Sequence, residues 1–339
     1  MTGGATISAL TLTSLGGVTS AGVGAGAGTG GAYSITPSAA STSLSNIAWT
    51  YVPALLSVTP RSITVAATPI TATYGTPVIV SQTAPAGYTV SSGTLVAGDA
   101  ITSVAVKYFN GSTNATTVPG TTGAATYAGA IIPSAATGTG GFNSTNYTIT
   151  YTPADLVVNK LAVTLTANAQ STPYGTALAL GTTAFTSSIS SLPNGDTITG
   201  ATLQYNNSAT VPGTTNASTY SGGIVVSSAS GTGGFGTTNY AISYVAGNLT
   251  VTPANVVITP VDLSAAGQSV VYSGTTQTFN PSTGFTVNGL QNSETPVFGA
   301  TGLASGLNVG TYPNNITSAI ITSLSGGGSL SNYSITVAS

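Results

Sequence analysis

Apolar and polar residues alternate along most of the chain, which is the pattern of half-buried β-strands. The alternation is clearest in TISALTLTS (6–14), ITVAAT (63–68), LAVTLTA (161–167) and NLTVTP (248–253). Val, Ile, Thr and Tyr favour the pleated surface of a sheet, and Gly, Asn, Ser and Pro mark turns between the runs. Glu and Lys, which favour helices, are nearly absent. The pattern predicts an all-β protein.

Four short motifs recur in the same order along the chain. Tyr-Gly-Thr at Tyr74 returns at Tyr174 and, as Tyr-Ser-Gly-Thr, at Tyr272, with spacings of 100 and 98 residues. The other three are an acidic turn (Gly98-Asp99, Gly195-Asp196 and Ser293-Glu294), VPGTT (118–122 and 211–215) and Asn-Tyr-x-Ile (146–149, 239–242 and 332–335). Self-similarity at a near-constant period predicts tandem structural modules.

The modules close with similar segments, and the next module starts within a few residues of each. The closing segments are AWTYVPALLSVTP (48–60), ITYTPADLVVNK (149–160) and ISYVAGNLTVTP (242–253). We therefore predict an N-terminal segment at 1–58 (a closing half with a Gly-rich insert), complete first and second modules at 59–158 and 159–254, and a third module at 255–339 without its closing strand. Linkers this short predict an elongated, semi-rigid array.

The composition offers little for catalysis. The chain has 339 residues, with three basic and five acidic side chains, no His, no Cys and a net charge of −2. General acid–base catalysis usually needs His, or a carboxylate or Lys beside a partner, and zinc sites are built mainly from Cys and His. The acidic residues are scattered along the modules. We expect no enzyme activity, and no catalytic, cofactor-binding or metal-binding residues.

The low charge also bears on partners. Three isolated basic residues cannot form the patch that binds nucleic acid, and no stretch is apolar enough to predict a membrane span. Weak charge removes the repulsion that keeps protein surfaces apart. We expect the chain to associate with itself, as neighbouring subunits of a homopolymer. Surface glycans are a second candidate class of partner.

Two repeated aromatic motifs are candidate binding residues with a simpler structural explanation. Tyr74, Tyr174 and Tyr272 can line a ligand groove, but Gly at positive φ in a turn, with the Tyr ring packed on the core, explains the motif better. The Asn-Tyr pairs are expected to open a strand, with Asn in the turn and Tyr on the core face. These pairs are Asn146-Tyr147, Asn239-Tyr240 and Asn332-Tyr333.

Asp99 and Asp196 are candidate calcium ligands. Calcium needs several oxygen ligands around one point, so a turn-forming role is expected for these acids. The GTGG segments at 138–141 and 231–234 look like a glycine-rich calcium repeat that lacks its Asp, and we expect flexible loops there.

The Tyr-Gly-Thr, Gly-Asp and Asn-Tyr-x-Ile motifs, with the closing Leu-Thr-Val-Thr-Pro (249–253), resemble the MBG and YDG families of repeats. Those families occur in tandem in very large bacterial surface proteins, many similar to filamentous-haemagglutinin-type adhesins. The resemblance covers 61–252 well, 257–339 moderately and 1–58 only at its end. It implies a β-sandwich-like or β-grasp-like module, a secreted or cell-surface location and a stalk or adhesive role, without catalytic residues.

The favoured hypothesis is a structural subunit or repeat segment of an extracellular bacterial filament or surface stalk. We expect strand exchange between chains, because the third module lacks a closing strand while the alternating 6–14 segment lacks an opening half. The alternative is an adhesin module that binds glycan or a host surface. In that case the partial modules only mark where an excerpt of a longer chain was cut.

Overall fold

The computed structural model describes residues 7–14, 22–23, 32–45, 47–260, 269–278, 285–299, 305–312 and 316–338. Within these ranges the protein is all-β with several sheets, which confirms the predicted class, and its helical segments are single turns of three residues. None of the helices in the described ranges is long and apolar enough to cross a membrane. The chain divides into two compact units, Met1–Leu161 and Ala162–Ser339, which are described in turn.

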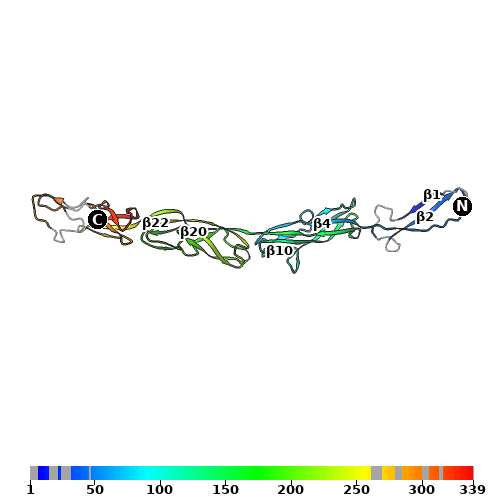
Figure 1. Ribbon diagram of the computed structural model, residues 1–339, viewed down its shortest axis with the longest axis horizontal. Helices are drawn as coiled ribbons and strands as arrows, with labels where there is room; N and C mark the ends of the chain where they lie inside the picture. The colour runs from blue at the N-terminus through cyan, green and yellow to red at the C-terminus, as the bar shows by residue number, and fades with distance from the viewer. Residues whose placement is uncertain are drawn as a thin grey trace. The chain divides into compact units, whose positions relative to one another are not determined.

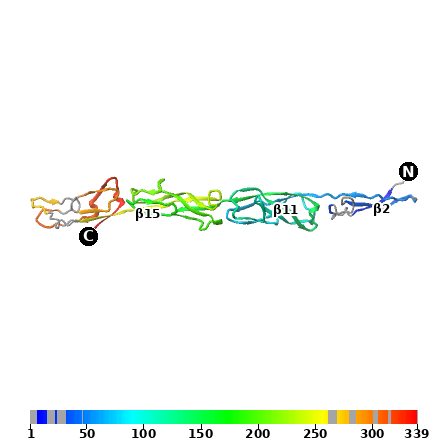
Figure 2. The same ribbon diagram turned by 90° about the horizontal axis from the view of Figure 1, so that it is seen from below.

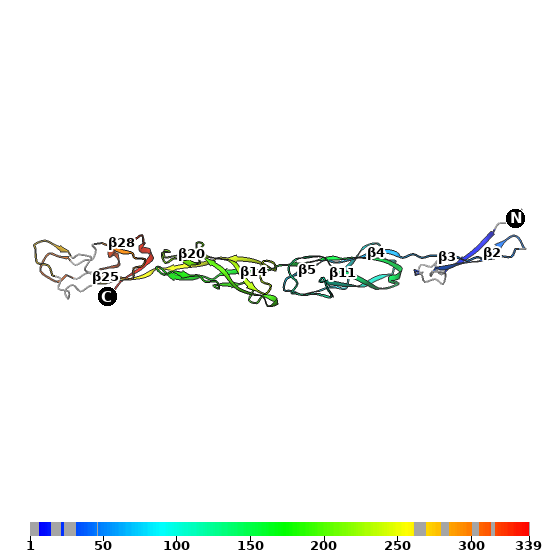
Figure 3. The same cartoon turned by 60° about the horizontal axis from the view of Figure 1, so that its bottom comes forward.

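The N-terminal segment of the first unit contains one small sheet. It consists of β1 (Ile7–Thr13), β2 (Tyr33–Thr42) and β3 (Ala54–Leu56), antiparallel and in that order (Figure 3). Within the described residues, no strand occupies the second edge of β3.

The first module consists of two larger sheets and one short strand pair. One sheet has the order β5 (Ile70–Thr73), β13 (Ala154–Asn159), β11 (Thr126–Thr139), β8 (Ala100–Phe109), β9 (Asn114–Ala115) (β11 in Figure 2). The other sheet places β4 (Arg61–Ala67) between β12 (Tyr147–Thr152) and β7 (Tyr88–Ser92), and the pair joins β6 (Val78–Ile79) to β10 (Thr117–Val118) (β4 and β10 in Figure 1). The β4–β12 and β5–β13 pairs are parallel.

The second module has a closely similar topology. Its larger sheet has the order β15 (Gln170–Pro173), β22 (Gly247–Thr252), β20 (Ser218–Thr232), β18 (Thr197–Gln204) (β20 and β22 in Figure 1). The other strands are β14 (Leu161–Ala167) between β17 (Phe185–Ser187) and β21 (Tyr240–Val245), and the pair β16 (Leu178–Ala179) and β19 (Thr210–Val211). The parallel pair β15–β22 corresponds to β5–β13.

The described part of the third module contains one sheet and two strand pairs. The sheet places β23 (Ala254–Pro260) between β25 (Phe285–Asn288) and β29 (Tyr333–Val337), and the pairs are β24 (Gln277–Thr278) with β27 (Ser305–Gly306) and β26 (Thr295–Phe298) with β28 (Ile321–Ser325). The parallel pairing of β23 with β29 repeats that of β4 with β12.

The predicted alternation places every second strand residue in the core, because successive side chains point to opposite faces. In β4, Ile63, Val65 and Ala67 are buried. In the second unit, buried residues of the second and third modules belong to one hydrophobic cluster, which includes Leu249 and Ile258. The second and third modules therefore share a continuous core.

Candidate functional site

Each module holds an acidic side chain against the tyrosine of its Asn-Tyr-x-Ile motif. In the first module the Tyr147 hydroxyl donates to Asp99 Oδ2 at 2.6 Å. The corresponding bonds run from Tyr240 to Asp196 Oδ2 and from Tyr333 to Glu294 Oε2, both at 2.7 Å. Such distances are typical of strong O–H···O⁻ hydrogen bonds. The acidic turn and the Asn-Tyr-x-Ile motif, far apart in sequence, thus form one structural pair in each module.

The GTGG segments complete this pair in the first two modules. The amide of Gly141 donates to Asp99 Oδ1 at 3.0 Å, and that of Gly234 donates to Asp196 Oδ1. A Cβ on Gly138 would lie 2.0 Å from the carbonyl oxygen of Ala100. The prediction of flexible loops at GTGG is therefore wrong, because these glycines let two backbones meet and supply an amide to the acid.

The acids that were candidate calcium ligands are engaged by the chain's own donors. Within the described ranges no group of three or more His, Cys, Asp or Glu side chains is placed to hold a metal ion. Asp196 and Glu294 are buried, whereas Asp99 is half-buried. Their hydrogen bonds link strands within the module, which extends the predicted turn role.

The Tyr-Gly-Thr motifs form the expected turns in the first two modules. Tyr74 and Tyr174 are buried, and the following glycines, Gly75 and Gly175, have φ values of 89° and 91°. Tyr272 differs, since it is 61% exposed. In the complete modules the residues before the tyrosine form β5 or β15, which pair with the closing strand.

The tyrosine of the second module also reaches the acid of the third. Tyr174 donates its hydroxyl to Glu294 Oε1, so this carboxylate accepts hydrogen bonds from phenols of two modules. The rings of Tyr174 and Tyr333 meet edge to face, with centroids 5.4 Å apart and an interplanar angle of 83°. We call Tyr174, Glu294 and Tyr333 the joint triad.

A second contact crosses the same joint. The side chain of Asn332 is fully buried; its Oδ1 accepts from the amide of Ala217 at 2.7 Å, and its Nδ2 donates to Asn216 Oδ1 at 3.0 Å. The first unit contains an equivalent contact, in which the amide of Val23 donates to Asn146 Oδ1 at 2.8 Å. The sequence pattern predicts only a turn role for these asparagines; their repeated position beside a buried Tyr is the signal that indicates a second role, as contacts to the preceding segment.

The pKa values of both phenols in the joint triad are raised. Burial raises the pKa of Tyr333 above its ordinary value of about 10, and the neighbouring Glu294 adds to the rise, while the amide of Gln291 opposes it. Burial also raises the pKa of Tyr174, again with a contribution from Glu294. Ionising either phenol would place a second negative charge beside the carboxylate.

Alkaline pH is therefore expected to open the joint triad. Because the folded pKa values lie above the unfolded value of about 10, the stabilisation is complete below that pH and is lost as pH rises through the raised values. Tyrosinate absorbance should show a late-titrating class of phenols, which shrinks in the Tyr333→Phe variant. Titration of all tyrosines together near pH ~10 would contradict this expectation.

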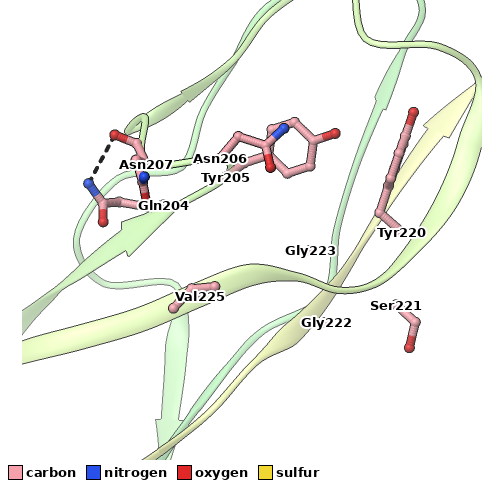
Figure 4. A pocket seen from close by; sticks show the side chains of 9 residues that line it. All are labelled: Gln204, Tyr205, Asn206, Asn207, Tyr220, Ser221, Gly222, Gly223 and Val225. Atoms are coloured by element: carbon pink, nitrogen blue, oxygen red, sulfur yellow. Dashed lines mark hydrogen bonds between the residues drawn. The ribbon is translucent and has the colours of Figure 1, made fainter.

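The second module also carries a pocket of about 670 Å³, which residues of β18 and β20 help to line. Figure 4 shows the Tyr220 ring at one side of the pocket, Gln204 at the other side, and Tyr205 with Asn206 between them. The two rings are 5.6 Å apart at 71°. Tyr220 donates its hydroxyl to the carbonyl of Asn216 at 2.9 Å, which ties this pocket to the loop that contacts Asn332.

Comparison with known proteins identifies one module. Residues 163–250 match the family model described as the MBG domain (YGX type). No curated protein and no solved structure matches the chain. The matched range contains Tyr174-Gly175-Thr176, the buried Asp196 and the Asn239-Tyr240 pair. The second module therefore carries the signature of a YGX-type MBG domain, which confirms the resemblance predicted from its motifs.

Proposed function

We propose that this chain is a structural repeat segment of an extracellular bacterial filament or surface stalk, and that it is not an enzyme. MBG domains are typical of extracellular surface proteins, and one module matches that family. The role proposed is mechanical: the modules act as spacers in an elongated array. The observation that carries the proposal is the buried joint between the second and third modules.

A buried polar joint favours one fixed orientation of the two modules. Glu294 is 6% exposed and Asn332 is 0% exposed, and both are satisfied by donors or acceptors of the second module. Separating the modules would exchange these contacts for water and expose the shared core. A stiff connection of this kind suits a stalk or filament better than a set of freely jointed domains.

The bonding of the acids supports a role without catalysis. Asp99, Asp196 and Glu294 each accept a hydrogen bond from a tyrosine of their own module. A general acid or base must reach a substrate proton, whereas these carboxylates are directed at the protein itself. They are better suited to holding strands together.

Small-angle X-ray scattering of the full chain tests the stiffness. We expect the profile of a stiff rod, and we expect Asn332→Ala to give a more flexible profile because it removes the contacts to Ala217 and Asn216. Asn248→Ala is the matched control, since Asn248 Oδ1 accepts a hydrogen bond from an amide of its own module, that of Gly222 at 3.0 Å. Equal flexibility of the wild type and Asn332→Ala would contradict a joint held by this contact.

Immunogold labelling of intact source cells with antibodies against the chain tests the location independently. Label on the cell surface or on filaments is expected. Label confined to the cytoplasm of sectioned cells would overturn the proposal.

The pocket of the second module supports a second candidate function, a glycan-binding adhesin module. Sugars commonly bind where aromatic rings offer an apolar face and amide side chains offer hydrogen bonds, and Tyr220, Gln204 and Asn206 provide both. A glycan array should then show selective binding that Tyr220→Ala abolishes. Tyr127→Ala is the matched control, because Tyr127 makes the corresponding bond to Gly123 in the first module. Absence of selective binding would leave the structural role alone.

A further inference from the structure

We propose that a second copy of this chain pairs its residues Ser269–Val271, as a parallel strand, with the open edge of β3. The inference rests on the proposed structural function and names the partner of assembly as the chain itself.

The complete modules supply the template. The strand that ends at the Tyr-Gly-Thr tyrosine runs parallel to the closing strand, with Ala72 opposite Val158 in one module and Thr172 opposite Val251 in the other. The amide of Tyr74 then donates to Asn159 O at 2.9 Å, and that of Tyr174 to Thr252 O at 2.8 Å. The same register therefore occurs twice.

The β2–β3 pair reproduces the part of this template that receives the added strand, which is the closing strand and its antiparallel neighbour. Tyr33 lies opposite Leu56, as Tyr127 lies opposite Leu156 and Tyr220 lies opposite Leu249. In all three places a tyrosine hydroxyl of the closing segment accepts a hydrogen bond from a strand amide. The pairs are Ala40 to Tyr51 at 2.8 Å, Ala136 to Tyr151 at 2.8 Å and Ala229 to Tyr244 at 2.9 Å. β3 is thus equivalent to β13 and β22.

The open edge leaves apolar side chains of the acceptor partly in water. Leu156 and Leu249 are 0% exposed, whereas the equivalent Leu56 is only half-buried. The equivalent of the buried Val158 and Val251 is Val58, which is also half-buried. Addition of a strand would cover these side chains and pair the edge amides.

The segment before Tyr272 has the sequence of the donor strand. Ser269-Val270-Val271-Tyr272 aligns with Ser171-Thr172-Pro173-Tyr174 through the tyrosine motif. Val270, Val271 and Tyr272 are 71%, 88% and 61% exposed, while Thr172 and Tyr174 are 5% and 4% exposed. Val270 and Tyr272 therefore face water where the template buries their counterparts, while Val271 aligns with the exposed Pro173.

Neither segment carries the usual protection against edge pairing. Proteins commonly place charges on exposed edge strands to prevent association, yet residues 1–60 and 263–293 contain no charged side chain. The template predicts that Ser57 pairs with Ser269 and Val58 with Val270. In that register the amide of Tyr272 donates to the carbonyl of Thr59.

Disulfide cross-linking of the full chain tests the register, because the chain has no cysteine of its own. Ser57 and Ser269 align with Val157 and Ser171, which are not buried in the complete modules, so the cysteines of the Ser57→Cys/Ser269→Cys variant should meet at an oxidisable position. We expect a ladder of dimers and higher oligomers on a non-reducing gel, which a reductant removes. The matched control, Ser57→Cys/Val270→Cys, places the thiols on opposite faces and should give several-fold less ladder.

Two outcomes would overturn the inference. One is that the Ser57→Cys/Ser269→Cys chain stays uncross-linked; the other is that it cross-links only within one chain, as a fast-migrating monomer. Circular dichroism should match the wild type in either variant, which separates a failed pairing from misfolding. Scattering and surface labelling test the proposed function without any cross-link, so the two proposals fail separately.

Discussion

The Glu294→Ala variant is expected to loosen the joint between the second and third modules by about 3 kcal/mol, because two buried phenols lose their acceptor. The amide of Ala217 reports on this joint, since it donates to Asn332 at 2.7 Å. Hydrogen exchange at that amide should accelerate about a hundredfold, at one decade per 1.4 kcal/mol. Mass spectrometry of peptides covering 211–220 measures the effect on the full chain.

Two further variants at the same position separate hydrogen bonding from packing. Glu294→Gln keeps an oxygen acceptor and a similar volume, so it should lose less protection than alanine. Glu294→Asp installs the acid found at positions 99 and 196, which keeps the bond type but shortens the reach to Tyr174. If the Ala217 amide exchanges as slowly in Glu294→Ala as in the wild type, the joint triad does not stabilise the joint.

The all-β class and the core positions follow from local patterns. Alternation in ITVAAT and LAVTLTA predicted strands, and β4 and β14 bury the alternate residues Ile63, Val65, Val163 and Leu165. Glycine after a motif tyrosine predicted a positive φ, which Gly75 and Gly175 adopt. These features depend on residues close in sequence, so a single chain is enough to predict them.

Contacts between distant segments were not predictable in the same way. Tyr174 and Glu294 are separated by 120 positions, and no local pattern indicates that one phenol reaches the next module. The GTGG interpretation failed for a related reason. It sought an acid inside the glycine-rich segment, whereas the acid of Gly234 is Asp196, which lies 38 positions earlier. Burial of an acid can be inferred only once the strands are paired.

The repeated motifs have two structural roles in the second unit. Within a module, the acid and the Asn-Tyr-x-Ile tyrosine join strands, as in Asp196 with Tyr240. At the joint, residues of the same two motifs in the third module, Glu294 and Asn332, accept hydrogen bonds from Tyr174 and Ala217 of the second. Glu294 therefore stabilises both the fold of its own module and the connection to the second.

The Gly231→Ala variant is expected to destabilise the second module by about 1–3 kcal/mol, the usual effect of forcing extra atoms into a packed site. An added Cβ would lie 2.1 Å from the carbonyl oxygen of Thr197 and 2.5 Å from the ring of Phe235. Because the first of these atoms belongs to the backbone, the end of the β18–β20 pair must move apart. Asp196 directly precedes Thr197 and would move with it, so it would lose the hydrogen bond from the amide of Gly234.

Gly236 provides the matched control for this substitution. It lies in the same loop, and an added Cβ would meet no atom within 4 Å. Alanine there should be neutral or slightly stabilising, because it reduces the freedom of the unfolded chain. Hydrogen exchange of the β18 and β20 amides distinguishes the two variants without assuming that the whole chain unfolds in one step. Equal exchange in Gly231→Ala and Gly236→Ala would show that the GTGG backbone contact has no structural effect, and that its glycines are needed only for flexibility.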